Sequence, residues 1–401
     1  MRAIRTFVCA GLFGLLILTG CISAMNANSA ATVEQSNTTI SQQPAAAAVA
    51  HTETAATPPI PSNTNTGLIP PDDPNIRYTG RFDFSNPQRP SFDWPATTIE
   101  AAFTGPGLTL LLSDNGNLYN VYIDGQASVL QARSGQQSYS LAQGLGNSSH
   151  TVRLVKRTEP FEGSISTFLG FELEAGHSLT SLPPAPQHHI EIIGDSITAG
   201  YGNEGSSPTC NFSLSTQNAE NTYGAMVARQ LDASYTIIAD SGLGVVRNYN
   251  ADDRFSQGTM FTQFKRTLGA RPSEDYVFDQ QPDAVIINLG TNDFSTTPQP
   301  HSEVFLQGYT ELIGFIRAHY PDAHIFAVGG PIMLDPAEAT IQSAVEQMRR
   351  VLEDERVHYV SVENNLALTA VDYGCDWHPN VSGQQKIADQ LTPIIAQTLN
   401  W

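Results

Sequence analysis

The stretch I-E-I-I-G-D-S-I-T-A-G-Y-G, from Ile190 to Gly202, joins an apolar run to a turn rich in small and polar residues. The run is typical of a buried β-strand, and Ser196 follows it on a turn from the strand into a helix. A serine at that place holds its hydroxyl exposed, with backbone N–H groups nearby that can face a developing negative charge. An acyl-transfer nucleophile needs both conditions, so we predict that Ser196 is a nucleophile.

The same alternation of strand and helix continues to the C-terminus. Further apolar β runs lie at 235–239, 284–289, 324–328 and 357–362, and amphipathic stretches predict helices around 219–232, 302–319, 335–353 and 382–398. Continuous Val/Ile-rich runs separated by helices indicate a parallel sheet covered on both faces. The sequence therefore predicts an α/β domain over residues 186–401, with its ligand at the carboxyl ends of the strands.

Three more residues with catalytic chemistry follow predicted strand ends. Gly242 lies in D-S-G-L-G, Asn292 in L-G-T-N-D and His378 in W-H-P-N. Because the carboxyl ends of parallel strands meet at one edge, we expect these residues to converge on Ser196. The N–H groups of Ser196 and Gly242 and the amide of Asn292 would form an oxyanion hole, and His378 would be the general base.

Residues 76–180 follow a different pattern. Short β runs bounded by Gly, Asn, Asp and Pro lie at 98–103, 108–113, 120–125 and 150–156. Asp124 and Gly125 predict a tight turn, and no helical period of useful length occurs before residue 180. We therefore predict an all-β sandwich over residues 76–180.

The N-terminus predicts export. Arg2 and Arg5 precede an apolar run too short to span a membrane comfortably, which is typical of a signal peptide and here covers residues 1–20. The run ends in L-T-G-C, which resembles the lipobox of bacterial lipoproteins, so we expect lipidation of Cys21. The alternative is an ordinary signal cleaved near the small residues at 24–31.

A tether is expected between the lipid anchor and the first domain. Residues 21–75 are rich in Ala, Thr, Asn, Ser, Gln and Pro, and such a composition cannot bury enough surface to offset its ordering entropy. Ile22, rather than Asp, follows Cys21, which in lipoproteins favours the outer membrane. We therefore expect an exported lipoprotein anchored in the outer membrane, periplasmic or at the cell surface.

The net charge limits the kinds of binding partner, and the cysteine content predicts the redox state of the thiols. The formal net charge is −19, with 39 acidic and 20 basic residues, which repels nucleic acid and anionic lipid surfaces. Apart from Cys9 in the signal and Cys21, the cysteines are Cys210 and Cys375. An oxidising compartment favours a disulfide between them, and two buried free thiols are the alternative. No Cys/His spacing predicts a zinc site.

The order of Ser196, Gly242, Asn292 and His378 resembles the SGNH hydrolase superfamily. The chain is similar as a whole to carbohydrate esterase family 2, acetyl xylan esterases that join a small jelly roll to an SGNH domain. The similarity lies in Y-T-G-R-F (78–82), Y-I-D-G (122–125), H-T-V-R-L-V-K-R-T-E (150–159), G-D-S-I-T-A-G-Y-G-N (194–203), S-G-L-G-V-V-R-N-Y (241–249) and G-C-D-W-H-P-N (374–380). The resemblance implies a flavodoxin-like three-layer α/β/α domain after a jelly roll, and the same roles for the four residues.

The residue that orients His378 departs from the superfamily pattern. Most SGNH enzymes place an Asp three residues before the histidine, where this chain has Cys375. The resemblance to family 2 implies a Ser-His dyad in which a backbone carbonyl replaces the carboxylate. The rival is Asp376, either accepting the Nδ1–H of His378 or only structuring its loop. A Cys210–Cys375 bridge would tie the His378 loop to the loop after Ser196.

The resemblance also implies the substrate: a carboxylic ester hydrolase that removes acetyl groups from xylan or glucomannan, with 6-O-acetyl hexose positions favoured. Trp377, Tyr201, Phe294 and Tyr249 lie close in sequence to the catalytic residues, so we expect them to bind sugar, with core packing as the alternative. No cofactor or metal is implied, the partner is an acetylated polysaccharide or oligosaccharide, and we expect a monomer.

Two other functions fit the same residues. An envelope protein could also reach O-acetyl groups of peptidoglycan or another envelope glycan. A non-catalytic glycan-binding lipoprotein, with the jelly roll as a lectin, represents a different class. The sandwich itself is expected either to bind glycan or to pack structurally against the hydrolase domain.

Overall fold

A computed structural model describes residues 66–161, 163–270, 275–362, 366 and 368–401. The predicted signal peptide, Cys21 and the tether up to residue 65 lie outside the described residues. The first strand, β1 (Thr66–Ile69), pairs with β10 (Ser166–Glu174), so the predicted start of the sandwich at residue 76 is too late. The reason is that the Leu68-Ile69 pair is too short a run to signal a strand without its partner.

Two antiparallel sheets form the N-terminal part, which confirms the all-β prediction. The first sheet contains β1, β10, β5 (Leu108–Asp114) and β8 (Gly135–Ala142) in that order, with β3 (Ser91–Phe92) paired to β10. The second contains β11 (Leu179–Thr180), β4 (Thr98–Thr104), β9 (Ser149–Lys156), β6 (Leu118–Ile123) and β7 (Gln126–Gln131), with β2 (Ile76–Thr79) paired to β4. The predicted tight turn at Asp124 and Gly125 joins β6 to β7.

The core of this sandwich comes from alternate residues of the strands. Along β5, Leu108, Leu110 and Leu112 are buried, while the residues between them are partly exposed. They pack with aromatic side chains that include Phe103 and Phe171. Period-two burial is what two sheets packed face to face require, because successive side chains of a strand point to opposite faces.

The C-terminal part is a five-stranded parallel sheet. Its strands are β12 (His188–Gly194), β13 (Ala233–Ala239), β14 (Ala284–Asn288), β15 (His324–Gly329) and β16 (Val357–Ser361). Their spatial order is β13-β12-β14-β15-β16, which is the flavodoxin-like order and confirms the predicted fold class. The chain passes from β12 to β13 on one side and then crosses to β14 on the other side of β12. In such folds the ligand binds at the carboxyl ends of the strands where the direction changes, here at β12.

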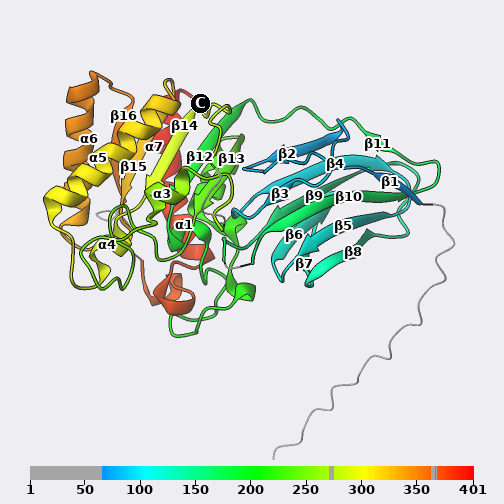
Figure 1. Cartoon of the computed structure of the whole chain (residues 1–401), viewed down its shortest axis with the longest axis horizontal. Coiled ribbons are helices and arrows are strands. Elements are labelled where there is room, and N and C mark those ends of the chain that lie inside the picture. Colours follow the sequence, from blue (N-terminus) through cyan, green and yellow to red (C-terminus); the bar gives the residue numbers. More distant parts are fainter. Residues whose placement is uncertain (1–65, 162, 271–274, 363–365, 367) are drawn as a thin grey trace, which may run out of the picture. The chain divides into compact units, whose positions relative to one another are not determined.

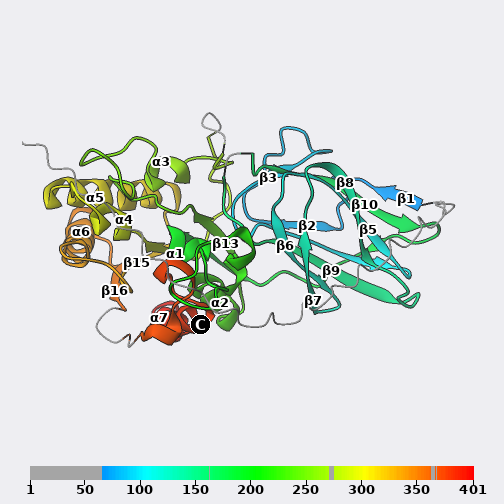
Figure 2. The same ribbon diagram turned by 90° about the horizontal axis from the view of Figure 1, so that it is seen from below.

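Helices cover both faces of this sheet (Figures 1 and 2). One face packs against α2 (Tyr223–Gln230) and α7 (Val381–Leu399), and the other against α3 (Met260–Phe264), α5 (Ser302–His319) and α6 (Ala337–Leu352). Two short helices, α1 (Ser196–Ala199) and α4 (Thr291–Ser295), directly follow β12 and β14. The sequence predicted a helix after the Ser196 turn, where α1 lies, but not α3 or α4, because a helix of about one turn is too short to show a helical period.

Among the described residues, no helix is long and apolar enough to cross a membrane.

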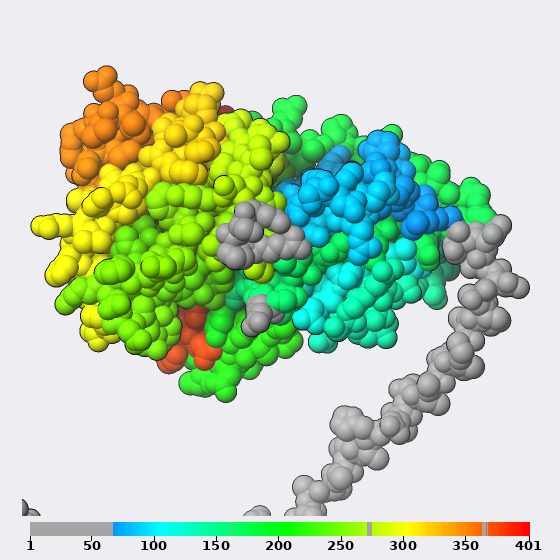
Figure 3. All heavy atoms as spheres, in the orientation of Figure 1, coloured from blue at the N-terminus to red at the C-terminus, as the bar shows by residue number. Residues whose placement is uncertain are grey.

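The sandwich and the α/β domain share buried contacts, and their surfaces meet in the space-filling view (Figure 3). Trp94, from the sandwich, is fully buried within the hydrophobic core of the α/β domain and donates from Nε1 to the carbonyl of Thr267 at 3.0 Å. Asp93 accepts from the backbone N–H groups of Gly269 and Ala270 at 3.0 and 2.8 Å. The two parts therefore fold against each other as one unit.

A buried charge pair lies at this junction. Arg81 donates from Nη2 to Glu191 Oε1 on β12 at 2.7 Å, and from Nη1 to the carbonyls of Phe264 and Arg266. Its guanidinium also lies 3.8 Å from the ring centroid of Tyr276. The second oxygen of Glu191 accepts from the hydroxyl of Tyr320 at 2.6 Å, so the carboxylate is bonded on both oxygens.

We predict that Arg81→Ala lowers the apparent free energy of unfolding by about 3–5 kcal/mol, because it leaves the Glu191 carboxylate buried without its charge partner. Urea denaturation measures the change. The matched control is Arg77→Ala, which breaks a 3.9 Å pair with Glu100 that is about one-quarter exposed on both sides and which we expect to cost less than about 1 kcal/mol. Equal losses in both variants would contradict the role given to Arg81.

Candidate active site

Ser196 lies at the first position of α1, directly after β12. Asp195 caps this helix by accepting from the N–H of Ile197 at 3.1 Å. The turn is tight: a Cβ at Gly194 would lie 2.0 Å from Thr198 Oγ1 and 3.1 Å from the carbonyl of Asn288, so only glycine fits there. The strand, the glycine and the cap together fix the Ser196 hydroxyl at the carboxyl edge of the sheet.

His378 reaches Ser196 from the far end of the chain. Its Nε2 lies 2.8 Å from Ser196 Oγ, and its Nδ1 lies 3.0 Å from the backbone carbonyl oxygen of Asp376. A carbonyl oxygen only accepts, so Nδ1 carries the hydrogen and Nε2 is free to accept the hydroxyl proton of Ser196. The carbonyl of Asp376 thus sets the tautomer that a general base needs.

The environment of His378 favours the neutral ring. Burial lowers the pKa of His378, and its hydrogen bond to the carbonyl of Asp376 offsets that shift only in part. A buried imidazole has lost water that would stabilise its charged form. His378 is therefore a neutral acceptor at a pH where an exposed histidine would be partly protonated.

The side chain of Asp376 has different partners from its carbonyl. The carboxylate accepts from the hydroxyl of Tyr201 at 3.1 Å and from the N–H of Phe212 at 2.9 Å. Tyr201 stacks on Phe212 with ring centroids 4.0 Å apart, and its ring lies 4.5 Å from that of His378. Asp376 therefore holds the histidine through its backbone and an aromatic pair through its carboxylate.

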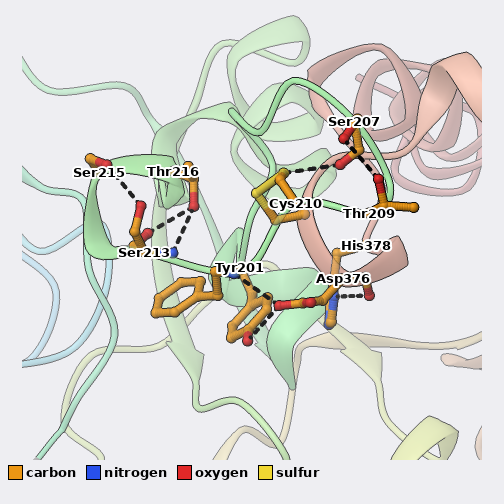
Figure 4. Close-up of a disulfide and its surroundings, with 11 residues drawn as sticks. Tyr201, Ser207, Thr209, Cys210, Ser213, Ser215, Thr216, Asp376 and His378 are labelled. Carbon is orange, nitrogen blue, oxygen red and sulfur yellow. Dashed lines mark hydrogen bonds between the residues drawn. A yellow bond between two sulfur atoms is a disulfide. The ribbon is translucent and has the colours of Figure 1, made fainter. Parts of the chain in front are cut away.

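The loop that carries His378 is tied to the loop that follows Ser196 (Figure 4). A disulfide joins Cys210 to Cys375, as the sequence predicted. Backbone bonds supplement it: the N–H of Cys375 donates to the carbonyl of Gly202 and that of Asp376 to the carbonyl of Cys210, both at 3.0 Å. Asp376 and Trp377 have left-handed φ values of 50° and 59°. The disulfide and the backbone hydrogen bonds can maintain such a strained turn.

Gly242 and Asn292 lie at the adjacent strand ends, beside the Ser196 turn. Gly242 follows β13 with a φ of +80°, a conformation that favours glycine, and its carbonyl accepts from the N–H of Tyr249 at 2.7 Å. Asn292 Nδ2 lies 3.1 Å from Asp195 Oδ2 and 3.0 Å from the carbonyl of Leu243. Both amide hydrogens of Asn292 thus have acceptors, and an oxyanion would compete with them.

Two buried carboxylates shape the turn around these donors. Asp293 accepts from the N–H groups of Val245, Val246 and Arg247 at 2.8–2.9 Å, which fixes the turn that follows Gly242. Burial raises the pKa of Asp293 to about 6 and that of Asp195 to about 7, because a carboxylate that has lost water is harder to ionise. Apart from its place directly after Asn292, no sequence pattern pointed to Asp293.

The four aromatic residues predicted to bind sugar do not share one environment. Trp377, which precedes His378, and Tyr249, whose N–H bonds to Gly242, are 56% and 58% exposed, and Tyr201 lies against the ring of His378. The prediction that Phe294 binds sugar was wrong, because this residue is 1% exposed and packs edge-on against Phe305 in the core. It lies on α4, whose other face presents Asn292. Phe212, which stacks on Tyr201, was missed because only the disulfide loop brings it there.

Two family models match the chain. The model of the carbohydrate esterase 2 N-terminal domain matches residues 78–183. The model of the GDSL-like lipase/acylhydrolase family matches residues 192–386. The first match covers most of the sandwich, and the second extends from β12 into α7.

Relatives of known structure or name match the same regions. The cellulase/esterase CelE of Acetivibrio thermocellus is 34% identical over 342 residues, which are 82% of this chain and 40% of that protein, so this chain spans less than half of CelE. An acetylxylan esterase / glucomannan deacetylase of Cellvibrio japonicus is 29% identical over 319 residues, 77% of this chain and 85% of that protein. The structure of a family two carbohydrate esterase from Clostridium thermocellum in complex with cellohexaose is 32% identical, with a TM-score of 0.74, and the match covers 81% of this chain and 99% of that one.

We predict that Asp376→Ala leaves Ser196 reactive, because the backbone carbonyl and not the carboxylate orients His378. The second-order rate of Ser196 modification by a fluorophosphonate, a reagent that requires an activated serine, should fall by less than about tenfold. The loss when a triad Asp is disabled is on the order of ten-thousandfold.

Two further variants calibrate this measurement. His378→Ala should lower the rate by at least about a thousandfold. Asp376→Asn keeps a side chain that tolerates the left-handed φ and should stay within a few-fold of the wild type. A loss in Asp376→Ala as large as that in His378→Ala would mean that the carboxylate orients the ring.

Proposed function

The chain belongs to carbohydrate esterase family 2, and on that premise we propose that it is an esterase that removes acetyl groups from a polysaccharide by a Ser-His acyl-enzyme mechanism. The observation that carries the proposal is the 2.8 Å contact between Ser196 Oγ and His378 Nε2, with Nδ1 of the same ring held by a carbonyl. That pair can accept a proton and form a bond to an acyl carbon in one step.

In the first half-reaction Ser196 Oγ attacks the acetyl carbonyl carbon while its proton passes to His378 Nε2. The carbonyl of Asp376 keeps the ring in place but supplies no full negative charge to the imidazolium. The tetrahedral oxyanion forms beside Gly242 and Asn292, whose N–H groups would stabilise it. Collapse expels the sugar oxygen, which takes the proton from His378, and leaves an acetyl-serine.

Water completes the cycle by the same route in reverse. His378 Nε2 accepts a proton from water, which attacks the acetyl-serine and passes through a second oxyanion at the same donors. Ser196 leaves with the proton from His378, and acetate is released.

A polysaccharide substrate is supported by the surroundings of Ser196 and by the relatives. Exposed aromatic faces at Trp377 and Tyr249, and the stacked ring of Tyr201, suit the apolar faces of sugar rings. The net charge of −19 favours a neutral glycan over an anionic one. The Cellvibrio relative is named for acetylxylan and glucomannan, and the Clostridium structure holds cellohexaose. We propose acetylated xylan or glucomannan, with 6-O-acetyl hexose favoured.

Acetate release from a panel of acetylated glycans tests the proposal. Acetylated glucomannan and xylan should release acetate, and Ser196→Ala should lower that release by at least about a thousandfold. Release from O-acetylated peptidoglycan alone would assign the enzyme to an envelope glycan. Saturable glycan binding by a wild type that releases no acetate would indicate a binding protein.

The acid limb of the pH profile tests the role of His378. The base acts only when neutral, so kcat/KM on a small acetate ester should fall about tenfold per pH unit below the pKa of His378. Because burial lowers that pKa from its ordinary value of 6.5, the midpoint should lie below 6.5.

Asp195 provides the control for this profile, because burial raises its pKa to about 7 beside the nucleophile. Asp195→Asn removes that titration while keeping a side-chain oxygen for the helix cap. The midpoint below 6.5 should persist in this variant. A midpoint above 6.5 that disappears with Asp195→Asn would show that Asp195, and not His378, sets the limb.

A further inference from the structure

The end of β9 and the residues that follow it bury consecutive polar side chains. Lys156, Arg157, Thr158 and Glu159 are between 0% and 8% exposed. Charged residues are rarely buried unless they are paired, because leaving water costs free energy that only hydrogen bonds or opposite charges offset. Such a run at the end of a sandwich strand indicates a specific structural task.

This segment is held rigidly from both sides. Lys156 Nζ donates to the carbonyl of Thr158 at 2.6 Å, to its hydroxyl at 3.1 Å, and to the carbonyl of Glu159 at 3.4 Å. Arg157 Nε donates to the carbonyl of Gln217 in the α/β domain at 3.1 Å. The backbone that carries Glu159 therefore cannot move independently of either domain.

The carboxylate of Glu159 crosses from the sandwich to the loop after β13. Glu159 Oε2 accepts from the N–H of Ser241 at 2.7 Å and from its hydroxyl at 2.6 Å. Ser241 directly precedes Gly242. Burial raises the pKa of Glu159, so an ionised carboxylate is costly at this place.

The loop from Ser241 to Tyr249 is thus fixed at two points. Glu159 holds its first residue from the sandwich, and Asp293 holds Val245, Val246 and Arg247 from α4. Gly242 lies between these points with a φ of +80°, without a side chain of its own to anchor it. The position of its N–H therefore depends on the two carboxylates, together with the bond from the N–H of Tyr249 to the Gly242 carbonyl at 2.7 Å.

We propose that Glu159 is a positioning residue for the oxyanion hole. By holding Ser241, it fixes the N–H of Gly242 at the distance that the transition state requires. The β-sandwich thereby takes part in catalysis without touching substrate, in addition to any structural role. The inference rests on the esterase mechanism proposed above.

The sensitivity of an oxyanion hole makes such positioning matter. Donors must lie about 2.7–3.1 Å from the oxyanion, and losing one costs about a hundred- to a thousandfold in kcat. A supporting contact that lets a donor drift by about half an ångström forfeits part of that factor. We therefore expect an effect smaller than the loss of a donor, expressed in kcat and not in KM.

The test compares Glu159→Ala and Glu159→Gln with Asn120→Ala in the full chain. Asn120 is a matched control: it is 7% exposed against 8% for Glu159, lies on the sandwich, and donates to Asn218 and Glu220 of the α/β domain at 3.0 and 2.7 Å. For each protein, kcat and KM are measured on a small acetate ester, together with the rate of fluorophosphonate modification and the melting temperature.

We expect Glu159→Ala to lower kcat by about 10- to 100-fold with KM within about threefold, and to slow fluorophosphonate modification in parallel. Glu159→Gln should recover most of the activity, because its amide oxygen can accept both bonds from Ser241. Asn120→Ala should lower the melting temperature by a similar amount while kcat stays within about twofold.

Several results would overturn the inference while leaving the proposed function intact. They are an unchanged kcat in Glu159→Ala, a change in KM alone, or an equal loss of kcat in Asn120→Ala. If Glu159→Ala does not fold, the variant Ser241→Ala decides, because it removes the 2.6 Å hydroxyl contact. We expect its kcat to be lower by about three- to tenfold. An unchanged kcat in this variant would overturn the inference. A wild type that neither hydrolyses the ester nor reacts with the fluorophosphonate would overturn the proposed function, and the inference with it.

Discussion

The buried pair between Arg81 and Glu191 joins the sandwich to β12, the strand on which the rest of the molecule depends. Glu191 lies within the strand that ends at Gly194, and Ser196 follows two residues later. A buried charge pair adds little stability over an apolar contact of the same size, but separating its partners is strongly destabilising because it leaves a buried charge uncompensated. This pair therefore fixes where the sandwich lies relative to the nucleophile strand, which makes a catalytic contribution from the sandwich physically reasonable.

The second constraint is the connection between two loops that are far apart in sequence. Ser196 directly follows a strand of the sheet, whereas His378 lies in the loop that leads into α7. The Cys210–Cys375 disulfide and the bonds of Cys375 and Asp376 to the loop after Ser196 hold the His378 loop beside the nucleophile. They also explain how a backbone carbonyl can do the work of a triad carboxylate: a carbonyl orients the ring only as well as its own backbone is held.

Asp376 shows why its position in the sequence was ambiguous. It stands two residues before His378, too close for its side chain to adopt the superfamily arrangement, yet its carbonyl is well placed to accept from Nδ1. Its carboxylate instead holds Tyr201 and Phe212, the stacked pair beside the histidine. One residue thus serves the base and the surface next to it through different atoms.

The sequence by itself determined the two domains, the five parallel strands, the long helices and the convergence of Ser196, Gly242, Asn292 and His378 at one sheet edge. Those features follow from local periodicity and from the rule that parallel strands end at a common edge, which need no knowledge of distant contacts. The prediction from sequence failed for Phe294, because a residue close to Asn292 on a one-turn helix faces either the site or the core, and only packing decides which. The tertiary structure alone decided the place of Phe212 and the contact from Glu159 to Ser241, because their separation in sequence carries no information about their distance in space. It also decided the partner of His378 Nδ1, because only the conformation of the loop determines whether the carbonyl or the carboxylate of Asp376 faces the ring.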